Sequence, residues 1–256
     1  MTRDSALQQQ PFSLMARLGA GLVLAAVASL ASAQTLPAAC GTLRQSWGPF
    51  DYRPERYIPE TTYRSHAALL AIVEHAHFTP EVENLIRGKT GALPGGDLSY
   101  TLGVFPNHHR ALIAVSTLAL KLKSPQPPET RFSVDCYFRR AMAFRPDDPM
   151  VRMVYANYLI QLGEKADAEQ QIDAVAATNP DGPLTLRNIA LLYFDAKNYD
   201  KSLQFVHKAA ATGLNVDIIK SKLQQAGQWK DAPPTAADKP ASTPGAEPSA
   251  EPQRRD

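Results

Sequence analysis

The sequence predicts an all-α fold: a short solenoid of stacked helical hairpins, preceded by an irregular N-terminal arm and followed by a disordered C-terminal tail. Two observations predict it. Apolar and small residues recur with a period of 34 between residues 149 and 214. From residue 79 onward, helix-start residues precede apolar residues spaced by three and four positions. A unit of this kind cannot bury its apolar face alone, so neighbouring units must stack.

The first 33 residues read as a cleavable signal peptide. An apolar run over residues 18–30 is followed by Ala31-Ser32-Ala33, small residues that fit a signal-peptidase site. The run is short for a membrane span, which takes about 20 residues, although an uncleaved amphipathic or membrane helix is the alternative. We therefore expect a periplasmic or secreted protein that begins near Gln34 and has no membrane insertion after cleavage.

The charge and the cysteine content limit which partners and which cellular compartment are expected. The net charge is +2 and no dense Lys/Arg block occurs, which disfavours nucleic acid and anionic membranes as partners. Cys40 and Cys136 are predicted to form a disulfide in an oxidising compartment. Closing a loop of roughly 100 residues would contribute about 4 to 5 kcal/mol. The alternatives are two unrelated thiols, or a lipid-modified Cys40 preceded by a poor lipobox with Pro37 in place of a branched apolar residue.

Residues 34–78 are predicted to form the irregular arm, because turn formers dominate and periodicity is weak. Residues 63–77 fit either a helix or a helix plus a strand. The arm also holds an aromatic set: Trp47, Phe50, Tyr52, Tyr57 and Tyr63. We expect these rings to pack on the first helices, since aromatic side chains dominate burial. A carbohydrate-binding platform is the alternative.

Residues 79–148 are predicted to be divergent helical repeats. Thr79 and Pro80 suit a helix start, the apolar stripe of Val82, Leu85 and Ile86 follows, and Gly88 marks its end. Further helices are expected over about 97–104, 108–122 and 130–144. Asn107 is expected to be the N-cap of the second of these three, with His108 and His109 as polar residues of its first turn.

Residues 149–214 contain two units in phase. With Pro149 and Pro183 in register, the matched positions are apolar or small: Tyr155 with Ile189, Ala156 with Ala190, Leu159 with Tyr193, Ala168 with Ser202, Ile172 with Val206, and Val175 with Ala209. Residues 215–229 read as a capping helix with Val216, Ile219 and Leu223 on one face and Lys220 and Lys222 outward. Residues 230–256 have almost no large apolar residue and are predicted to be disordered.

This register resembles the tetratricopeptide repeat, whose pattern has small residues at two helix crossings and a closing proline. The positions that match are Phe138, Ala141, Pro146, Ala156, Gly163, Ala168, Pro180, Ala190, Tyr193 and Ala209. Arg152 replaces a usual large apolar residue, and Leu214 replaces the closing proline. The resemblance is strong over residues 130–214 and weak over 79–124.

Three N-terminal strings are also similar to those of an uncharacterised group of exported bacterial proteins with this repeat. They are Gly48-Pro49-Phe50-Asp51-Tyr52-Arg53, Gly96-Asp97-Leu98-Ser99-Tyr100-Thr101-Leu102 and Phe105-Pro106-Asn107-His108-His109-Arg110. We know of no established activity for that group, so this resemblance leaves the role of the protein open.

No motif predicts catalysis, a metal site or a cofactor. His75 and His77 are two positions apart and His108 and His109 are adjacent, spacings that do not place both rings on one helix face. The sequence lacks a Gly-x-Ser-x-Gly nucleophile string and a phosphate-binding glycine loop. We therefore expect a protein that is not an enzyme.

The tetratricopeptide resemblance implies a concave groove lined by the first helix of each unit. The expected lining residues are Met150, Met153, Asn157, Ile160, Gln161, Leu184, Arg187, Asn188, Leu191, Phe194 and Asp195. Asn157 and Asn188 resemble parts of a peptide-carboxylate clamp, with Lys222 as a cation, but Met153 stands where that clamp has lysine. An apolar face of a peptide or partner helix is therefore the expected ligand. The predicted function is a periplasmic protein-interaction scaffold, and the alternative is an envelope enzyme or glycan-binding protein that uses the aromatic arm.

Overall fold

The computed structural model describes residues 36–44, 46–53, 66–89 and 93–232. Within these ranges every regular element is a helix, so the predicted all-α class is confirmed. The predicted signal peptide, most of the predicted tail, Tyr57 and Tyr63 lie outside the described residues. Among the described residues, no helix combines the length and apolar character needed to cross a bilayer.

The N-terminal part contains a short 3-10 helix η1 (Ala38–Cys40) and helices α1 (His66–His77), α2 (Pro80–Glu83) and α3 (Gly95–Val104). Helix α1 lies in the segment expected to be irregular, and residues 66–77 are helical throughout. It packs on α3, which packs on the following helix α4. Apolar side chains of the arm cover the contact between these helices, so the arm belongs to the folded unit.

Helix α2 is shorter than predicted. The sequence predicts an apolar stripe that runs to Ile86 and a helix that ends at the glycines, but the helix ends at Glu83. Leu85 adopts a left-handed backbone conformation with φ 58°, which stops the helix. Val82 is fully buried and Leu85 packs on the core, whereas Ile86 is 71% exposed. The local pattern located the helix, and the backbone turn at Leu85 set its length.

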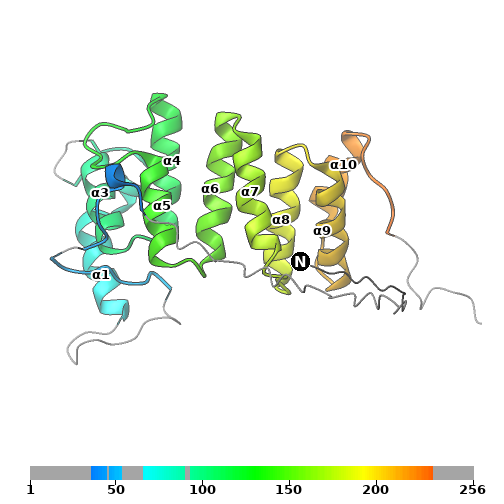
Figure 1. Cartoon of the computed structure of the whole chain (residues 1–256), viewed down its shortest axis with the longest axis horizontal. Helices are drawn as coiled ribbons and strands as arrows, with labels where there is room; N and C mark the ends of the chain where they lie inside the picture. The colour runs from blue at the N-terminus through cyan, green and yellow to red at the C-terminus, as the bar shows by residue number, and fades with distance from the viewer. Residues whose placement is uncertain (1–35, 45, 54–65, 90–92, 233–256) are drawn as a thin grey trace, which may run out of the picture. The chain divides into compact units, whose positions relative to one another are not determined.

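The remaining helices form successive antiparallel pairs that stand side by side in chain order (Figure 1). They are α4 (His109–Leu122), α5 (Val134–Phe144), α6 (Pro149–Leu162), α7 (Lys165–Ala176), α8 (Pro183–Asp195), α9 (Tyr199–Ala211) and α10 (Asp217–Gln225). Each of α4, α6 and α8 packs on the odd-numbered helix after it and on the next even-numbered helix. This is the connectivity of a helical-repeat solenoid, and it confirms that fold.

The period of 34 is visible in the helix boundaries. Helices α6 and α8 begin at residues 149 and 183, and α7 and α9 begin at residues 165 and 199. Ala156, Ala168, Ala190 and Ala209, four of the small residues of the repeat pattern, are all fully buried. A small side chain at a crossing lets two helix backbones approach closely, so the pattern has a direct packing cause.

Two departures from the repeat pattern have local explanations. Ser202 stands where the first unit has Ala168, and its buried Oγ donates a hydrogen bond to the carbonyl oxygen of Ala190 at 2.8 Å. Arg152 stands where a large apolar residue is usual, and its Nη1 donates to Oε1 of Gln171 at 2.8 Å. Burial lowers the pKa of Arg152. Both polar side chains are tolerated because each has a hydrogen-bond acceptor.

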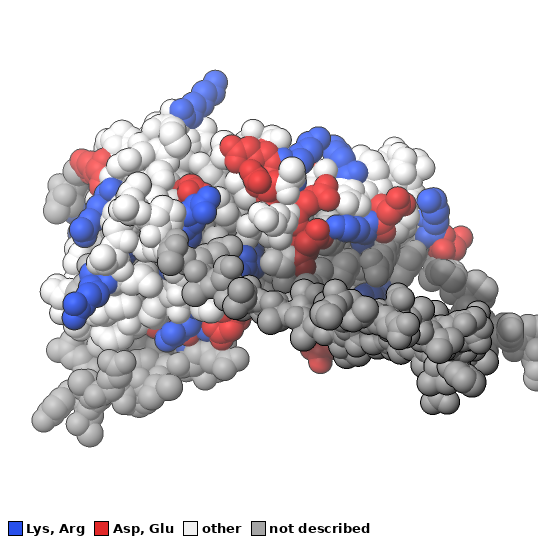
Figure 2. All heavy atoms as spheres, viewed as in Figure 1, with Lys and Arg blue, Asp and Glu red and all other residues white. Residues whose placement is uncertain are grey.

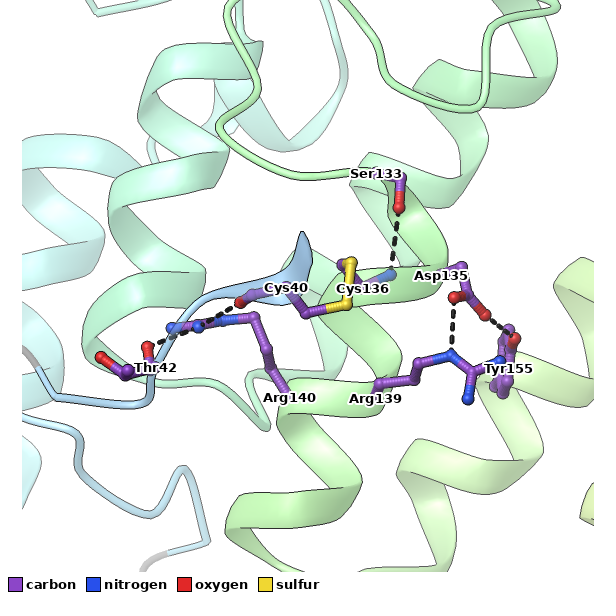
Figure 3. The surroundings of a disulfide bond; sticks show 8 residues. All are labelled: Cys40, Thr42, Ser133, Asp135, Cys136, Arg139, Arg140 and Tyr155. Carbon is purple, nitrogen blue, oxygen red and sulfur yellow. Dashed lines mark hydrogen bonds and ion pairs between the residues drawn. A yellow bond between two sulfur atoms is a disulfide. The ribbon is translucent and has the colours of Figure 1, made fainter. Parts of the chain in front are cut away.

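The predicted disulfide is present. Cys40 of η1 is bonded to Cys136 in the first turn of α5, with a Cα–Cα distance of 5.0 Å (Figure 3). Ser133 caps α5, and its Oγ accepts a hydrogen bond from the backbone nitrogen of Cys136. The predicted helix over 130–144 therefore begins four residues later, at Val134. The bridge fastens the start of the arm to the repeat region.

Candidate partner-binding face

The predicted groove residues lie on two helices, α6 and α8, that contact each other. Asn157 and Gln161 are exposed on α6, and Leu184 on α8 is 58% exposed. The other members are partly buried: Met150, Ile160, Arg187, Asn188, Leu191, Phe194 and Asp195. Met153 differs, because it is only 5% exposed and belongs to the core. The structure thus brings the set together on one pair of helices, with Met153 beneath its surface.

Phe194 is the aromatic centre of this face. Its ring meets the ring of Tyr199 edge-on, with centroids 5.5 Å apart. The ammonium nitrogens of Lys197 and Lys222 lie 5.7 Å and 5.3 Å from the Phe194 centroid. Because Lys222 comes from α10, this part of the face is shared by three helices. An apolar side chain seated on Phe194 would therefore have two cations beside it.

Polar groups on the same face lack internal partners. Among the described residues, the side-chain amides of Asn157 and Asn188 make no hydrogen bond, and Nε of Arg187 is buried without an acceptor. A buried donor without an acceptor is destabilising, and a bound carbonyl or carboxylate group would remove that cost. We call the set Asn157, Ile160, Gln161, Arg187, Asn188, Leu191 and Phe194 the repeat face.

A second group of polar side chains fastens the arm to the repeats. The cluster contains Asp51 and Arg53 of the arm, Asn107 before α4, and Asp148 at the start of α6. Nδ2 of Asn107 donates to Oδ1 of Asp51 at 2.7 Å and to Oδ2 of Asp148 at 2.9 Å. Its Oδ1 accepts from the backbone nitrogen of Tyr52 at 2.9 Å. We call these four charged or amide residues the arm cluster.

Hydrogen bonding keeps both carboxylates of the arm cluster ionised. Burial opposes the charge of Asp51, but hydrogen bonds from Arg53, Asn107 and Arg145 outweigh it and hold the Asp51 pKa well below its ordinary value. Asp148 behaves alike: burial raises its pKa, and hydrogen bonds from His109 and Asn107 lower it further than burial raises it. Asp148 also caps α6 by accepting from the backbone nitrogen of Met150. The hydrogen bonds of the arm cluster thus hold its buried carboxylates in their charged form and join the arm to the start of α6.

The structure corrects the interpretation of Asn107 and its neighbours. Asn107 is fully buried in the arm cluster, and the N-cap of α4 is His108, whose Nδ1 accepts from the backbone nitrogen of Ala111 at 3.1 Å. His108 is fully buried too, and burial lowers its pKa, although Glu74 at 3.1 Å opposes that shift. Among the described residues, no three His, Cys, Asp or Glu side chains are grouped to hold a metal ion.

The described aromatic rings of the arm pack on the first helices, as expected. The Phe50 ring lies 5.7 Å from the Phe105 ring, and the Tyr52 ring lies 4.2 Å from that of His108. Trp47 meets Phe50 edge-on. Sequence reasoning missed the arm cluster itself. Asp51 and Asn107 lie in two of the distinctive N-terminal strings, but residues 56 positions apart carry no local signal of contact.

Charge is mixed on the visible surface. Basic and acidic side chains are interspersed over the face drawn in Figure 2. Large single-sign patches are the usual mark of nucleic-acid binding. The mixture on this face fits the low net charge of the whole chain, +2.

Comparison with known proteins supports the repeat. The chain is similar to interferon-induced protein with tetratricopeptide repeats 3 of Mus musculus, with 28% identity over 90 residues, which are 35% of this chain and 22% of that protein. The chain thus spans only about a fifth of the length of this relative. No protein-family model matches the chain, and no solved structure matches it significantly. The similarity supports helical repeats of the tetratricopeptide type.

Proposed function

We propose that the protein is an exported interaction scaffold that binds a peptide or partner helix on the repeat face. The observation that carries the proposal is a partly exposed apolar surface, Leu191 and Phe194, beside polar groups without internal partners. Helical repeats of this type present such surfaces to extended peptides and helices. Support for a protein partner also comes from the tetratricopeptide-like similarity.

The chemistry of the repeat face selects among peptides. Phe194 has cations of Lys197 and Lys222 near its ring, and Arg187 has an unused buried Nε–H. The proposed ligand segment therefore carries an apolar anchor side chain with an acidic group close to it. Asn157 and Asn188 offer amides that can bond its backbone, as side-chain amides donate and accept together.

Export is the second part of the proposal. The Ala31-Ser32-Ala33 site after an apolar run supports a cleaved signal peptide. The Cys40–Cys136 disulfide supports an oxidising compartment, because such bonds are rare where thiols are kept reduced. The intact mass of protein recovered from its cells tests this directly. A chain beginning near Gln34 with no alkylatable thiol is the expected result, and an intact N-terminus or a lipid on Cys40 would contradict it.

The binding proposal is tested by separating partner capture from stability. Co-purification and mass spectrometry identify the partner, and its affinity is then measured for Asn157→Ala, Phe194→Ala and Ala168→Leu. Truncating exposed Asn157 should change stability by no more than about 0.5 kcal/mol. Truncating partly buried Phe194 should cost about 1 to 2 kcal/mol of stability. If Phe194 is an interface anchor, the same truncation should also cost about 2 kcal/mol or more of binding free energy.

Ala168→Leu is the matched core control. Its side chain is fully buried at a helix crossing, so overpacking should cost about 1 to 3 kcal/mol of stability. Capture per folded molecule should remain near that of the unmodified protein. The proposal fails if both face variants retain full affinity. A glycan array is the complementary test: glycan binding abolished by Trp47→Ala, without any protein partner, would favour the aromatic arm as the site instead.

A further inference from the structure

A cavity of about 270 Å³ lies between the arm, α3 and the start of α5, away from the repeat face. Besides Val104 and two glycines, the residues that line it carry aromatic, hydroxyl or cationic groups and include Trp47, Ser99, Tyr100, Arg131, Phe132 and Arg140. Ligand sites for drug-sized molecules usually enclose roughly 300 to 1,000 Å³, so this cavity suits a smaller molecule.

Arg140 contributes an incompletely used guanidinium to this cavity. The residue is only 1% exposed. Its Nη1 donates to the carbonyl oxygens of Cys40 at 2.9 Å and Thr42 at 2.6 Å, which fixes the group beside the disulfide (Figure 3). Nε and Nη2, which form the other edge of the guanidinium, have no hydrogen-bond partner among the described residues. Two parallel N–H donors on one edge are the geometry that a carboxylate accepts.

The two arginines that line the cavity have no acidic partner in the described part of the chain. Among the described residues, neither Arg131 nor Arg140 forms an ion pair with an acidic side chain. Both guanidinium groups lie near the same ring, with their central carbons 5.2 Å and 4.6 Å from the Phe132 centroid. Burial lowers the pKa of Arg140, and the nearby charge of Arg131 lowers it too. Buried charge is costly unless an opposite charge is bound.

The rings of the cavity indicate the rest of the ligand. Tyr100 is 44% exposed and stacks on His77 with centroids 3.9 Å apart, which holds its ring in place. Trp47 is fixed edge-on against Phe50. The Tyr137 hydroxyl and Ser99 Oγ are hydrogen-bonded to each other at 2.6 Å, so these two hydroxyl groups of α5 and α3 already have a partner. The groups left for a ligand are therefore the Nε–Nη2 edge of Arg140, which lacks a hydrogen-bond partner among the described residues, and the exposed aromatic surface.

We propose that this cavity binds an organic carboxylate whose body is a single aromatic or apolar group. The carboxylate pairs with Nε and Nη2 of Arg140, with Arg131 as a second cation, and the body lies against Trp47 and Tyr100. The same chemistry occurs in a free small acid and in the C-terminal residue of a peptide. This site is separate from the repeat face, and its test does not depend on the proposed partner binding.

Trp47 lines the cavity and supplies a fluorescence readout. The chain has two tryptophans, so a Trp229→Phe background isolates Trp47. Phenylacetate is the first probe, and we expect it to alter the Trp47 emission with a Kd at or below about 1 mM. Its neutral isostere phenylacetamide should bind at least about tenfold more weakly, since it lacks the charge-assisted hydrogen bonds. Inorganic phosphate and glucose are the comparison probes.

Variants connect the binding to the two arginines. Arg140→Lys keeps the positive charge but removes the two parallel N–H donors of the guanidinium, and should weaken phenylacetate binding about tenfold. Because Arg140 also holds Cys40 and Thr42, Arg131→Gln at an exposed position is the second variant, expected to weaken binding about threefold. Arg139→Gln is the matched control. Arg139 lies next to Arg140 on α5 but is exposed and pairs with Asp135, so this substitution should leave the Kd unchanged.

Each outcome decides the proposal. A dipeptide ending in phenylalanine, with a free or amidated carboxyl terminus, separates the sources: tighter binding of its free acid indicates a peptide end, and binding of phenylacetate alone indicates a small acid. Equal binding of phenylacetate and phenylacetamide would overturn the proposal. So would binding of glucose or phosphate in place of the acid, absence of binding by every acid, or affinities unaffected by both arginine variants.

Discussion

Replacing Asn107 by alanine should loosen the contact between the arm and the repeats, which the Cys40–Cys136 disulfide and the Arg145–Asp51 ion pair still join. The side chain is fully buried and makes three hydrogen bonds, to Asp51, Asp148 and the backbone of Tyr52. A hydrogen bond to a charged group contributes about 1.5 to 3 kcal/mol, and one to a neutral group about 1 kcal/mol. Both carboxylates keep other donors, so the lower figures apply. The expected loss is about 4 kcal/mol of unfolding free energy.

Urea unfolding followed by circular dichroism at the helix signal measures this loss. For a folded part of this size, about 4 kcal/mol corresponds to a fall in Tm of roughly 8 to 16 °C. Limited proteolysis should also cut the arm of Asn107→Ala faster than that of the unmodified protein. Asn157→Ala, an exposed asparagine on α6, is the matched control. A loss below about 1 kcal/mol for Asn107→Ala would refute the role given to the arm cluster.

Three further predictions concern pH, the disulfide and a close backbone contact. Burial lowers the pKa of His108 below its ordinary 6.5, so below pH 6.5 the unfolded chain binds a proton at His108 that the folded chain does not, and the free energy of unfolding measured with urea should fall. It should fall again below pH 3.8, because the unfolded chain then protonates Asp51 while the lowered pKa keeps Asp51 ionised in the folded chain. If stability is constant from pH 7.5 to 5, the burial of His108 is wrong. Reducing the disulfide should cost about 4 to 5 kcal/mol, and equal Tm values with and without reductant would contradict that. Gly95→Ala should cost about 1 to 3 kcal/mol because its Cβ would lie 2.0 Å from the Pro128 carbonyl oxygen, while Gly96→Ala, with 3.7 Å to its nearest neighbour, should be near neutral by thermal melting; equal Tm values for the two would contradict the contact.

The repeat region was predictable because its signals are local. Pro149 and Pro183 start helices, Gly163 takes the left-handed conformation after α6, and the alanines of the pattern are buried at crossings. Each of these follows from spacing within a unit of 34 residues. The disulfide was predictable for a different reason: the chain has two cysteines, so the sequence offers one pairing.

The contacts of the arm were not predictable in the same way. Asn107 reads as a helix cap by type and position, yet it is buried because Asp51 and Asp148 approach it from distant parts of the chain. The cavity beside Arg140 combines residues from positions 47, 99 and 131, which no periodicity relates. Helix α2 ended early through the φ of Leu85, a conformation that leucine seldom adopts. Long-range contacts and backbone turns decided each of these features.

The central claim is that a protein partner binds the repeat face, and site-specific photocrosslinking in the native cells tests it most directly. Photoreactive benzoylphenylalanine replaces exposed Gln161 on α6, or exposed Gln204 on α9 as the control position. We expect a discrete protein adduct from position 161, little or none from position 204, and loss of the adduct when Phe194→Ala is added. Equal adducts from both positions, no adduct from position 161, or an adduct that survives Phe194→Ala would contradict the claim.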